Sequence, residues 1–142
     1  MRVFAYCRVS TADQTTANQV AELQAAGFQI EPHRVIEETV SGSVPARERR
    51  EFARLMDRLE RDDVIVVTKL DRLGRSAIDV RSVVDALAAI GVRTHCLGLG
   101  GVDLTSAAGR MTMQVIAAVA EMERDLLIER TQAGLRRAKA SG

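Results

Sequence analysis

The stretch VFAYCRVS, residues 3–10, joins a buried strand to the first polar groups of a possible site. Its apolar run from Val3 to Tyr6 predicts a strand over about residues 2–7. The chain turns polar at Arg8 and Ser10, and the residues that follow are typical of a turn leading into a helix. Ligands of open α/β sheets bind beyond the carboxyl ends of the strands, so an arginine and a hydroxyl are expected where a site would lie.

This pair of side chains has two interpretations. Ser10 or Thr11 could cap the next helix while Arg8 remains solvated. Alternatively, Ser10 is a nucleophile beside a cation that binds an anionic substrate, most simply a phosphate. Residues 6–10 alone leave both interpretations open.

The composition predicts one folded domain with an aliphatic core. The chain has 142 residues, of which 46% are hydrophobic, but only one Tyr, three Phe and no Trp. Scarce aromatic residues argue against a base-stacking platform for single-stranded nucleic acid. The net charge is +1, so the chain lacks the strongly basic surface that gives tight DNA affinity by itself.

Cysteine usage and hydropathy restrict the compartment and the cofactors. Cys7 and Cys96 fall in strand-like runs and are expected to be buried thiols. With His33 and His95 they form no metal-ligand spacing, so we expect no metal and no other cofactor. No amino-terminal signal and no long apolar span are visible, which indicates the cytoplasm.

Strands alternate with helices over residues 1–104, the expected α/β core. Further strands are expected at about 34–38, 64–67 and 92–97, with helices at about 16–26, 47–60 and 76–90. We expect Ile78, Leu87 and Ile90 on the inward face of the last of these helices, and residues 98–101 to form a flexible loop. Val64–Val67 is continuously apolar and β-branched, as in a central parallel strand. The pattern predicts an α/β fold, a mainly parallel sheet flanked by helices as in flavodoxin.

A long helix is expected over residues 105–139. At 1.5 Å per residue it would be roughly 50 Å long, so part of it must project. Its first half is apolar nearly all round, including Met111, Val115, Val119 and Met122. Because the sheet can cover only one face, we expect a second subunit to cover the other. Two shorter helices folded back within one chain are the alternative.

Charged residues from three segments are expected at one edge of the sheet. The first strand supplies Arg8 and Ser10, and Arg47 is expected at the start of a helix, where backbone N–H groups also favour an anion. Residues after the third strand add Lys69, Asp71, Arg72 and Arg75. Gathered cations imply an anionic substrate, and arginine matches phosphate geometry. The bland alternative for residues 71–75 is a solvated, salt-bridged turn.

These motifs resemble the catalytic domain of the serine site-specific recombinases, the resolvases and DNA invertases. The resemblance covers essentially the whole chain. The matching residues are Tyr6-Cys7-Arg8-Val9-Ser10-Thr11, Gln14, Gln19, Ser41-Gly42 with Arg47 five residues later, Lys69-Leu70-Asp71-Arg72-Leu73-Gly74-Arg75, Glu121-Met122-Glu123-Arg124 and Ile128-Glu129-Arg130-Thr131.

The resemblance implies a mechanism. Ser10 would attack a DNA phosphodiester and hold the 5′ end as a phosphoserine, which needs neither ATP nor metal for rejoining. Arg8, Arg47, Arg72 and Arg75 would surround the phosphate, and Asp71 with Arg72 would handle protons. The resemblance assigns supporting roles to Tyr6, Gln14, Gln19 and Lys69.

The resemblance also implies partners. The long helix would form a homodimer, and pairs of dimers would assemble into a tetramer on two double-stranded DNA sites. Glu129 and Arg130 would lie near the active-site end or the DNA.

The family's small members carry a helix-turn-helix after this domain. It is expected to be absent here, since the chain ends at Gly142, where that module would begin. Whether the reaction is resolution, inversion or integration, and at which sequence, is not encoded in these residues.

Two other functions stay open at this point. One is a dimeric flavodoxin-like module that binds an anion or nucleotide without chemistry. The other is a dimerisation domain that has lost activity. A binding module has no need of Ser10 near Asp71, and no departure at the motif positions favours the second.

Overall fold

Five strands form one sheet in the order β2-β1-β3-β4-β5. The computed structural model describes residues 1–141. The strands are β1 (Val3–Val9), β2 (Val35–Thr39), β3 (Val64–Val67), β4 (Arg93–Cys96) and β5 (Val102–Asp103). The pairs among β1 to β4 are parallel and the β4–β5 pair is antiparallel. As predicted, the four buried β-branched or aliphatic residues of β3 form the central strand.

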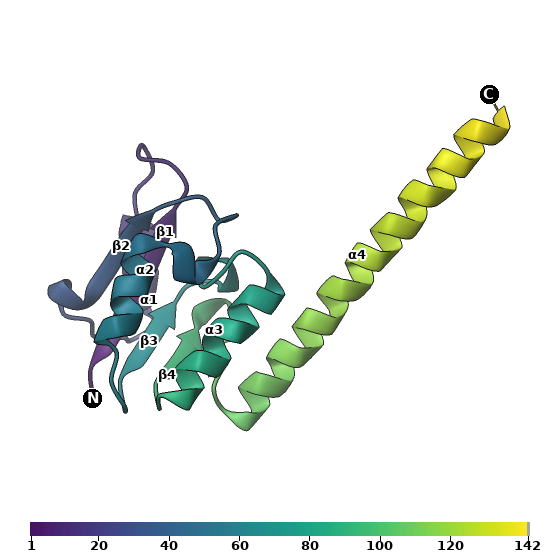
Figure 1. The fold of residues 1–142 in the computed structure, drawn as a ribbon. Coiled ribbons are helices and arrows are strands. Elements are labelled where there is room, and N and C mark those ends of the chain that lie inside the picture. Colours follow the sequence, from purple (N-terminus) through teal and green to yellow (C-terminus); the bar gives the residue numbers. More distant parts are fainter. Residues whose placement is uncertain (142) are drawn as a thin grey trace.

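Helices cover both faces of this sheet (Figure 1). They are α1 (Ala17–Ala25), α2 (Arg50–Arg58), α3 (Ala77–Ala89) and α4 (Ala107–Ser141). Leu23 of α1 packs on one face with Ala5 and Cys7. Phe52 of α2 and Leu87 of α3 pack on the other face in a larger core. The fold is therefore the predicted α/β arrangement with a mainly parallel sheet.

Three details of the expected elements differ in the structure. The helix expected from residue 47 begins at Arg50, because residues 46–48 form a separate 3₁₀ turn. Ile78 and Ile90 are 51% and 40% exposed rather than inward. At about 100° per residue Ile78 lies opposite the inward Leu87. Residues 97–99 form another 3₁₀ turn, and Val102 and Asp103 add the short antiparallel strand β5.

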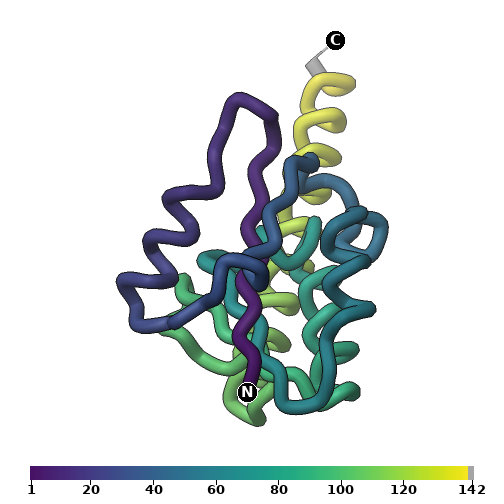
Figure 2. The backbone as a smooth tube through the Cα atoms, turned by 90° about the vertical axis from the view of Figure 1, so that its left-hand side faces the viewer, coloured from purple at the N-terminus to yellow at the C-terminus, as the bar shows by residue number. Residues whose placement is uncertain are grey.

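Helix α4 is continuous and leaves the core. Met113 and Ala117 are buried, but the exposed residues dominate beyond residue 118. Figures 1 and 2 show α4 rising beside α3 and projecting past the end of the molecule where the loop after β1 lies, opposite the amino terminus. The single long helix was predicted, and the alternative of two folded-back helices was wrong.

Candidate active site

A polar hollow of about 450 Å³ lies at the carboxyl end of β1. It brings together Ser10, two glutamines, and the cations Lys69 and Arg72 from the segment that follows β3. Its lining residues are Val9, Ser10, Asp13, Gln14, Thr15, Asn18, Gln19, Glu22, Lys69 and Arg72. Five of the expected site residues therefore share one hollow.

The two glutamines fix the backbone at the end of β1. The buried Gln19 side chain accepts from Arg8 N at 3.2 Å and donates to Arg8 O at 2.9 Å. The Gln14 side-chain oxygen accepts from the backbone N–H of Ser10 at 3.0 Å and of Thr11 at 3.2 Å. Ser10 is thus presented by a turn whose amides are already satisfied, while its side chain stays exposed.

Arg8 joins the serine to the neighbouring loop. Its Nη1 donates to Ser10 Oγ at 3.2 Å and to Val40 O at 3.0 Å. Gly42 permits this, since a Cβ there would lie 3.1 Å from Arg8 Nη2. Burial, and then the charges of Arg49 and Arg72, lower the pKa of Arg8, although a guanidinium remains protonated at neutral pH. Arg8 Nε is buried and has no hydrogen-bond partner among residues 1–141.

Arg72 approaches the same strand from the other side. Its Nη1 donates to Arg8 O at 3.2 Å, and its buried Nε lacks a hydrogen bond within the described chain. Asp71 Oδ1 lies 3.6 Å from that Nε, with its side chain 65% exposed. Two guanidinium groups beside one hydroxyl favour an anion with several oxygens, as a phosphate has.

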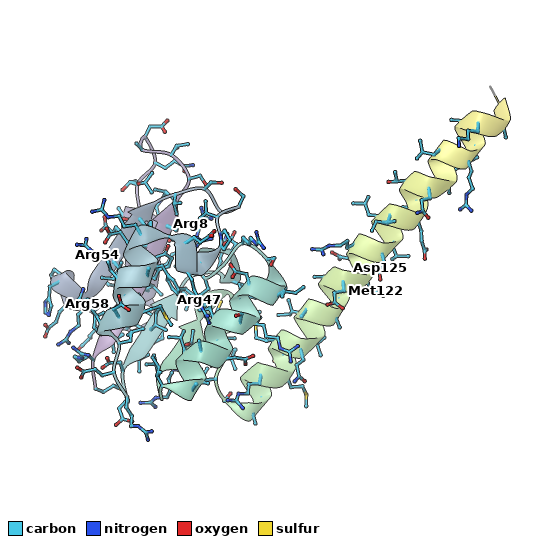
Figure 3. The ribbon with its side chains drawn as sticks, in the orientation of Figure 1. Arg8, Arg47, Arg54, Arg58, Met122 and Asp125 are labelled. Carbon is cyan, nitrogen blue, oxygen red and sulfur yellow. The ribbon has the colours of Figure 1, made fainter. Side chains whose placement is uncertain are left out.

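Arg47 does not join this group, which corrects the expectation. Its Nη2 donates to the carbonyl of Ser82 at 3.3 Å, and it borders a separate hollow between α2 and α3 (Figure 3). The arginine that this segment brings to the site is Arg49, which is fully buried. Arg49 donates to the carbonyls of Val44 at 3.0 Å, Arg72 at 2.7 Å and Gly42 at 3.4 Å.

Glu38 places Arg49 by capping the helix that follows it. Its carboxylate accepts from the backbone N–H of Glu51 at 2.7 Å and of Phe52 at 3.2 Å. Tyr6 OH donates to the same carboxylate at 2.6 Å. Burial and this hydrogen bond raise the pKa of Tyr6, so its hydroxyl remains a donor. Tyr6 therefore supports the site through α2 rather than facing the hollow.

Arg75 and Asp71 lie next to this centre rather than in it. Both border a mainly apolar hollow of about 240 Å³ that also includes Ile116 of α4. Arg75 further borders a hollow of about 550 Å³ together with Arg124 of α4. The long helix thus reaches the rim of the site with a cation.

The expected interface residues of α4 are exposed. Met111, Val115, Val119 and Met122 are 65%, 57%, 43% and 55% exposed. Their spacing of three and four residues places them along one side of the helix. Glu129 and Arg130 are exposed on the projecting half of α4, four and five residues after Asp125 in sequence. Figure 3 labels Asp125 on this helix.

Within residues 1–141, no group of three or more His, Cys, Asp or Glu side chains is arranged to hold a metal ion. In the same part of the chain, no helix is long and apolar enough to cross a membrane.

The fold and this edge of the sheet define a resolvase-type α/β domain, with a serine hydroxyl among arginines and a long carboxyl-terminal helix. The family model described as "Resolvase, N terminal domain" matches residues 3–142, and the chain belongs to this family of serine recombinases. The family carries out site-specific DNA recombination, in which DNA is cleaved and rejoined at recombination sites.

Two Escherichia coli proteins illustrate the relationship. The transposon Tn2501 resolvase is 68% identical over 141 residues, which cover 99% of this chain and 73% of that protein. Serine recombinase PinR of strain K12 is 57% identical over 141 residues, covering 99% of this chain and 72% of that protein.

Solved structures show the same fold. The N-terminal catalytic domain of TP901-1 integrase has a TM-score of 0.67 at 27% identity, covering 89% of this chain and 98% of that one. A resolvase family site-specific recombinase from Streptococcus pneumoniae has a TM-score of 0.62 at 26% identity, covering 100% and 99%.

Proposed function

We propose that this chain breaks and rejoins DNA at recombination sites through a phosphoserine at Ser10. The observation that carries the proposal is the Arg8 Nη1–Ser10 Oγ hydrogen bond of 3.2 Å at the mouth of a polar hollow. It holds the serine oxygen beside a guanidinium cation. A phosphodiester bound there would have its phosphorus next to Oγ and its free oxygens toward guanidinium groups.

In the proposed cleavage step, Ser10 Oγ bonds to phosphorus and the bond from phosphorus to the 3′ oxygen breaks. The hydroxyl proton of Ser10 is removed, and the leaving 3′ oxygen gains a proton. Asp71 and Arg72 are the proposed proton-handling pair because they lie 3.6 Å apart beside the hollow. The reverse attack by a 3′ hydroxyl releases Ser10, so the phosphoester bond is conserved and neither ATP nor a metal is required.

Charge stabilisation falls to the arginines. Arg8 and Arg72 would contact the phosphate directly, and Arg75 would approach from the neighbouring hollow. Arg49 takes the role that the resemblance implied for Arg47, because it lies against Arg72 and the 42–44 loop. Lys69 adds a cation to the lining of the hollow, while Gln14 and Gln19 orient the end of β1.

The proposed assembly is a homodimer through α4 that pairs into a tetramer on two DNA sites. Residues 1–104 form the catalytic core in this proposal, and residues 105–139 form the interface helix of the same domain. Met111, Val115, Val119 and Met122 would contact the partner, and Glu129 with Arg130 would lie toward the DNA. Because DNA is the substrate, we place the reaction on the nucleoid of a bacterial-type cytoplasm.

The test is recombination by a fusion of residues 1–142 to a DNA-binding module of known site. One plasmid would carry two recombination sites, each a crossover sequence flanked by two copies of the module's site, and products would be read by restriction mapping. We expect Ser10→Ala to abolish recombination. Thr11→Val, which changes the adjacent exposed hydroxyl, is the matched control and should retain it. Equal recombination by Ser10→Ala and the parent fusion would overturn the proposal.

A further inference from the structure

Asp79, in the first turn of α3, ties together two segments that border the site. Its Oδ2 accepts from the backbone N–H of Ala46 at 3.0 Å and from that of Arg75 at 2.8 Å. The two donors belong to the loop after β2 and to the turn after β3, which are 29 residues apart in sequence. One carboxylate oxygen therefore sets the distance between these segments.

The carboxylate of Asp79 is closely surrounded by neighbouring atoms. The Ser76 hydroxyl caps α3 by accepting from Asp79 N at 3.2 Å, which fixes the start of the helix. On the other side lies Gly74, where an added Cβ would stand 2.8 Å from Asp79 Oδ2 and 3.0 Å from Val80 N. A side chain at residue 74 would push the carboxylate away from both amides.

We infer that Asp79 is a positioning residue for Arg75 in DNA cleavage. This inference rests on the proposed function. Arg75 is exposed, and both residues border the hollow of about 550 Å³ that also includes Arg124. Asp79 holds the backbone of Arg75 through one hydrogen bond and the backbone of Ala46 through another. It therefore sets the position of Arg75 relative to the loop that carries the buried Arg49, three residues after Ala46.

The geometry requires an acceptor oxygen at residue 79 rather than a negative charge. Both donors are neutral backbone amides that converge on one oxygen. Asparagine can offer an oxygen at the same position, whereas alanine cannot. An acidic residue that merely favoured the amino end of α3 through the helix dipole would instead depend on its charge. Asp79→Asn and Asp79→Ala therefore separate the two roles.

The experiment measures the single-turnover rate of covalent adduct formation on pre-bound DNA, using the fusion described above. We expect Asp79→Ala to slow the rate by about 100-fold, as for a displaced catalytic group. Gly74→Ala should slow it for the same reason. Asp79→Asn should recover most of the lost rate. The rates are compared at a temperature below the melting temperature of every variant, and DNA affinity should stay near that of the parent fusion.

A double-mutant cycle shows whether Asp79 acts through Arg75. In an Arg75→Lys background, Asp79→Ala should cost much less than it does alone, because the side chain it positions has already been changed. A purely structural role would give additive losses. Amide hydrogen exchange supplies a readout independent of activity: Asp79→Ala should deprotect the N–H groups of Ala46 and Arg75, and Asp79→Asn should keep them protected.

Additive losses, an unchanged rate in Asp79→Ala, or Asp79→Asn as slow as Asp79→Ala would each overturn the inference. Unchanged exchange at both amides in Asp79→Ala would overturn it as well. These results differ from failure of the proposed function, in which the parent fusion itself forms no adduct that depends on Ser10.

Discussion

Three guanidinium groups crowd one side of the site without an equal number of carboxylates. Arg8 and Arg49 are buried, and Arg72 donates to the Arg8 carbonyl. The charges of Arg49 and Arg72 add to burial in lowering the pKa of Arg8. Such crowding is unfavourable until an anion neutralises it, which supports the proposed phosphate substrate.

Substitution by lysine should have a large effect on stability at Arg49 and a small effect at Arg47. Arg49→Lys should lower the free energy of unfolding by about 1–3 kcal/mol, because lysine cannot serve the three carbonyls that Arg49 contacts. It should also slow DNA cleavage. Arg47→Lys, on the exposed turn, should change stability by no more than about 0.5 kcal/mol.

Urea unfolding and the adduct rate measure both effects. Greater damage from Arg47→Lys than from Arg49→Lys would contradict the assignment of Arg49 to the site.

At the scale of the elements, local patterns predicted β3 and α4 but not the start of α2. The four apolar residues of β3 are buried on both faces, so their pattern alone decides the strand. The first turn of helix α2 is capped by Glu38, whose carboxylate accepts hydrogen bonds from the backbone N–H groups of Glu51 and Phe52. Glu38 lies 13 and 14 residues before these two donors in sequence. No local signal carries that contact. Counting residues from Gly42 therefore selected Arg47, while the fold brings in Arg49.

The rest of the site also contains some features that local patterns predicted and others that depend on contacts distant in sequence. Strand ends placed Ser10, Arg8 and Arg72 together, since parallel strands β1 and β3 finish at one edge. The separation of Asp71 and Arg75 into a neighbouring hollow depends on side-chain directions in the turn at residues 70–76. The position of the Asp79 carboxylate depends on a hydrogen bond from the backbone N–H of Ala46, which lies in a loop distant in sequence. Sequence spacing specifies neither of these.

Two glycines of α4 should respond oppositely to alanine. At Gly109 a Cβ would collide with the Asp103 carbonyl and stand 2.6 Å from Leu104 Cα, so Gly109→Ala should cost about 1–3 kcal/mol. At Gly134 the space is open, and Gly134→Ala should favour the helix by about 0.5–1 kcal/mol.

Denaturant unfolding with circular dichroism at 222 nm would measure both variants. Equal effects at the two positions would contradict the close approach of α4 to β5.

Asp103 should make the start of α4 sensitive to acid. Burial works against its charged form, but the Thr105 hydroxyl at 2.6 Å and the amides of Thr105 and Thr94 outweigh it and lower the pKa. Since the folded-state pKa is depressed, the stabilisation is present above the unfolded value of about 3.9 and is lost as pH falls through the folded-state pKa.

The stability difference between the parent protein and Asp103→Asn should therefore be constant near neutral pH and shrink below about pH 4. A difference that persisted unchanged to pH 2 would show that the carboxylate charge is not responsible.

At the scale of the whole molecule, α4 exposes an apolar side that the core cannot cover. Met111, Val115, Val119, Met122 and Leu126 recur at helical spacing and are all exposed. Exposed apolar surface of this kind marks an interaction site. Its partner in the proposal is the same side of a second copy.

Val119→Glu should therefore weaken self-association, because it would bury a charge in that interface. Ala120→Glu is the matched control, since residue 120 is also exposed but lies on the other side of the helix from Met122. Sedimentation velocity over a concentration series would report the association. Equal sedimentation of the two variants and the parent protein would contradict an interface on this side.

The most direct test of the central claim is to identify the protein–DNA bond itself. The fusion would react with paired sites, denaturant would trap intermediates, and nuclease-trimmed peptides would be sequenced by mass spectrometry. We expect a nucleotide linked through its 5′ phosphate to Ser10, a free 3′ hydroxyl on the other strand end, and no adduct from Ser10→Ala. A linkage at another residue, a 3′ phosphate linkage, or no adduct from the folded and DNA-bound parent fusion would contradict Ser10 as the nucleophile.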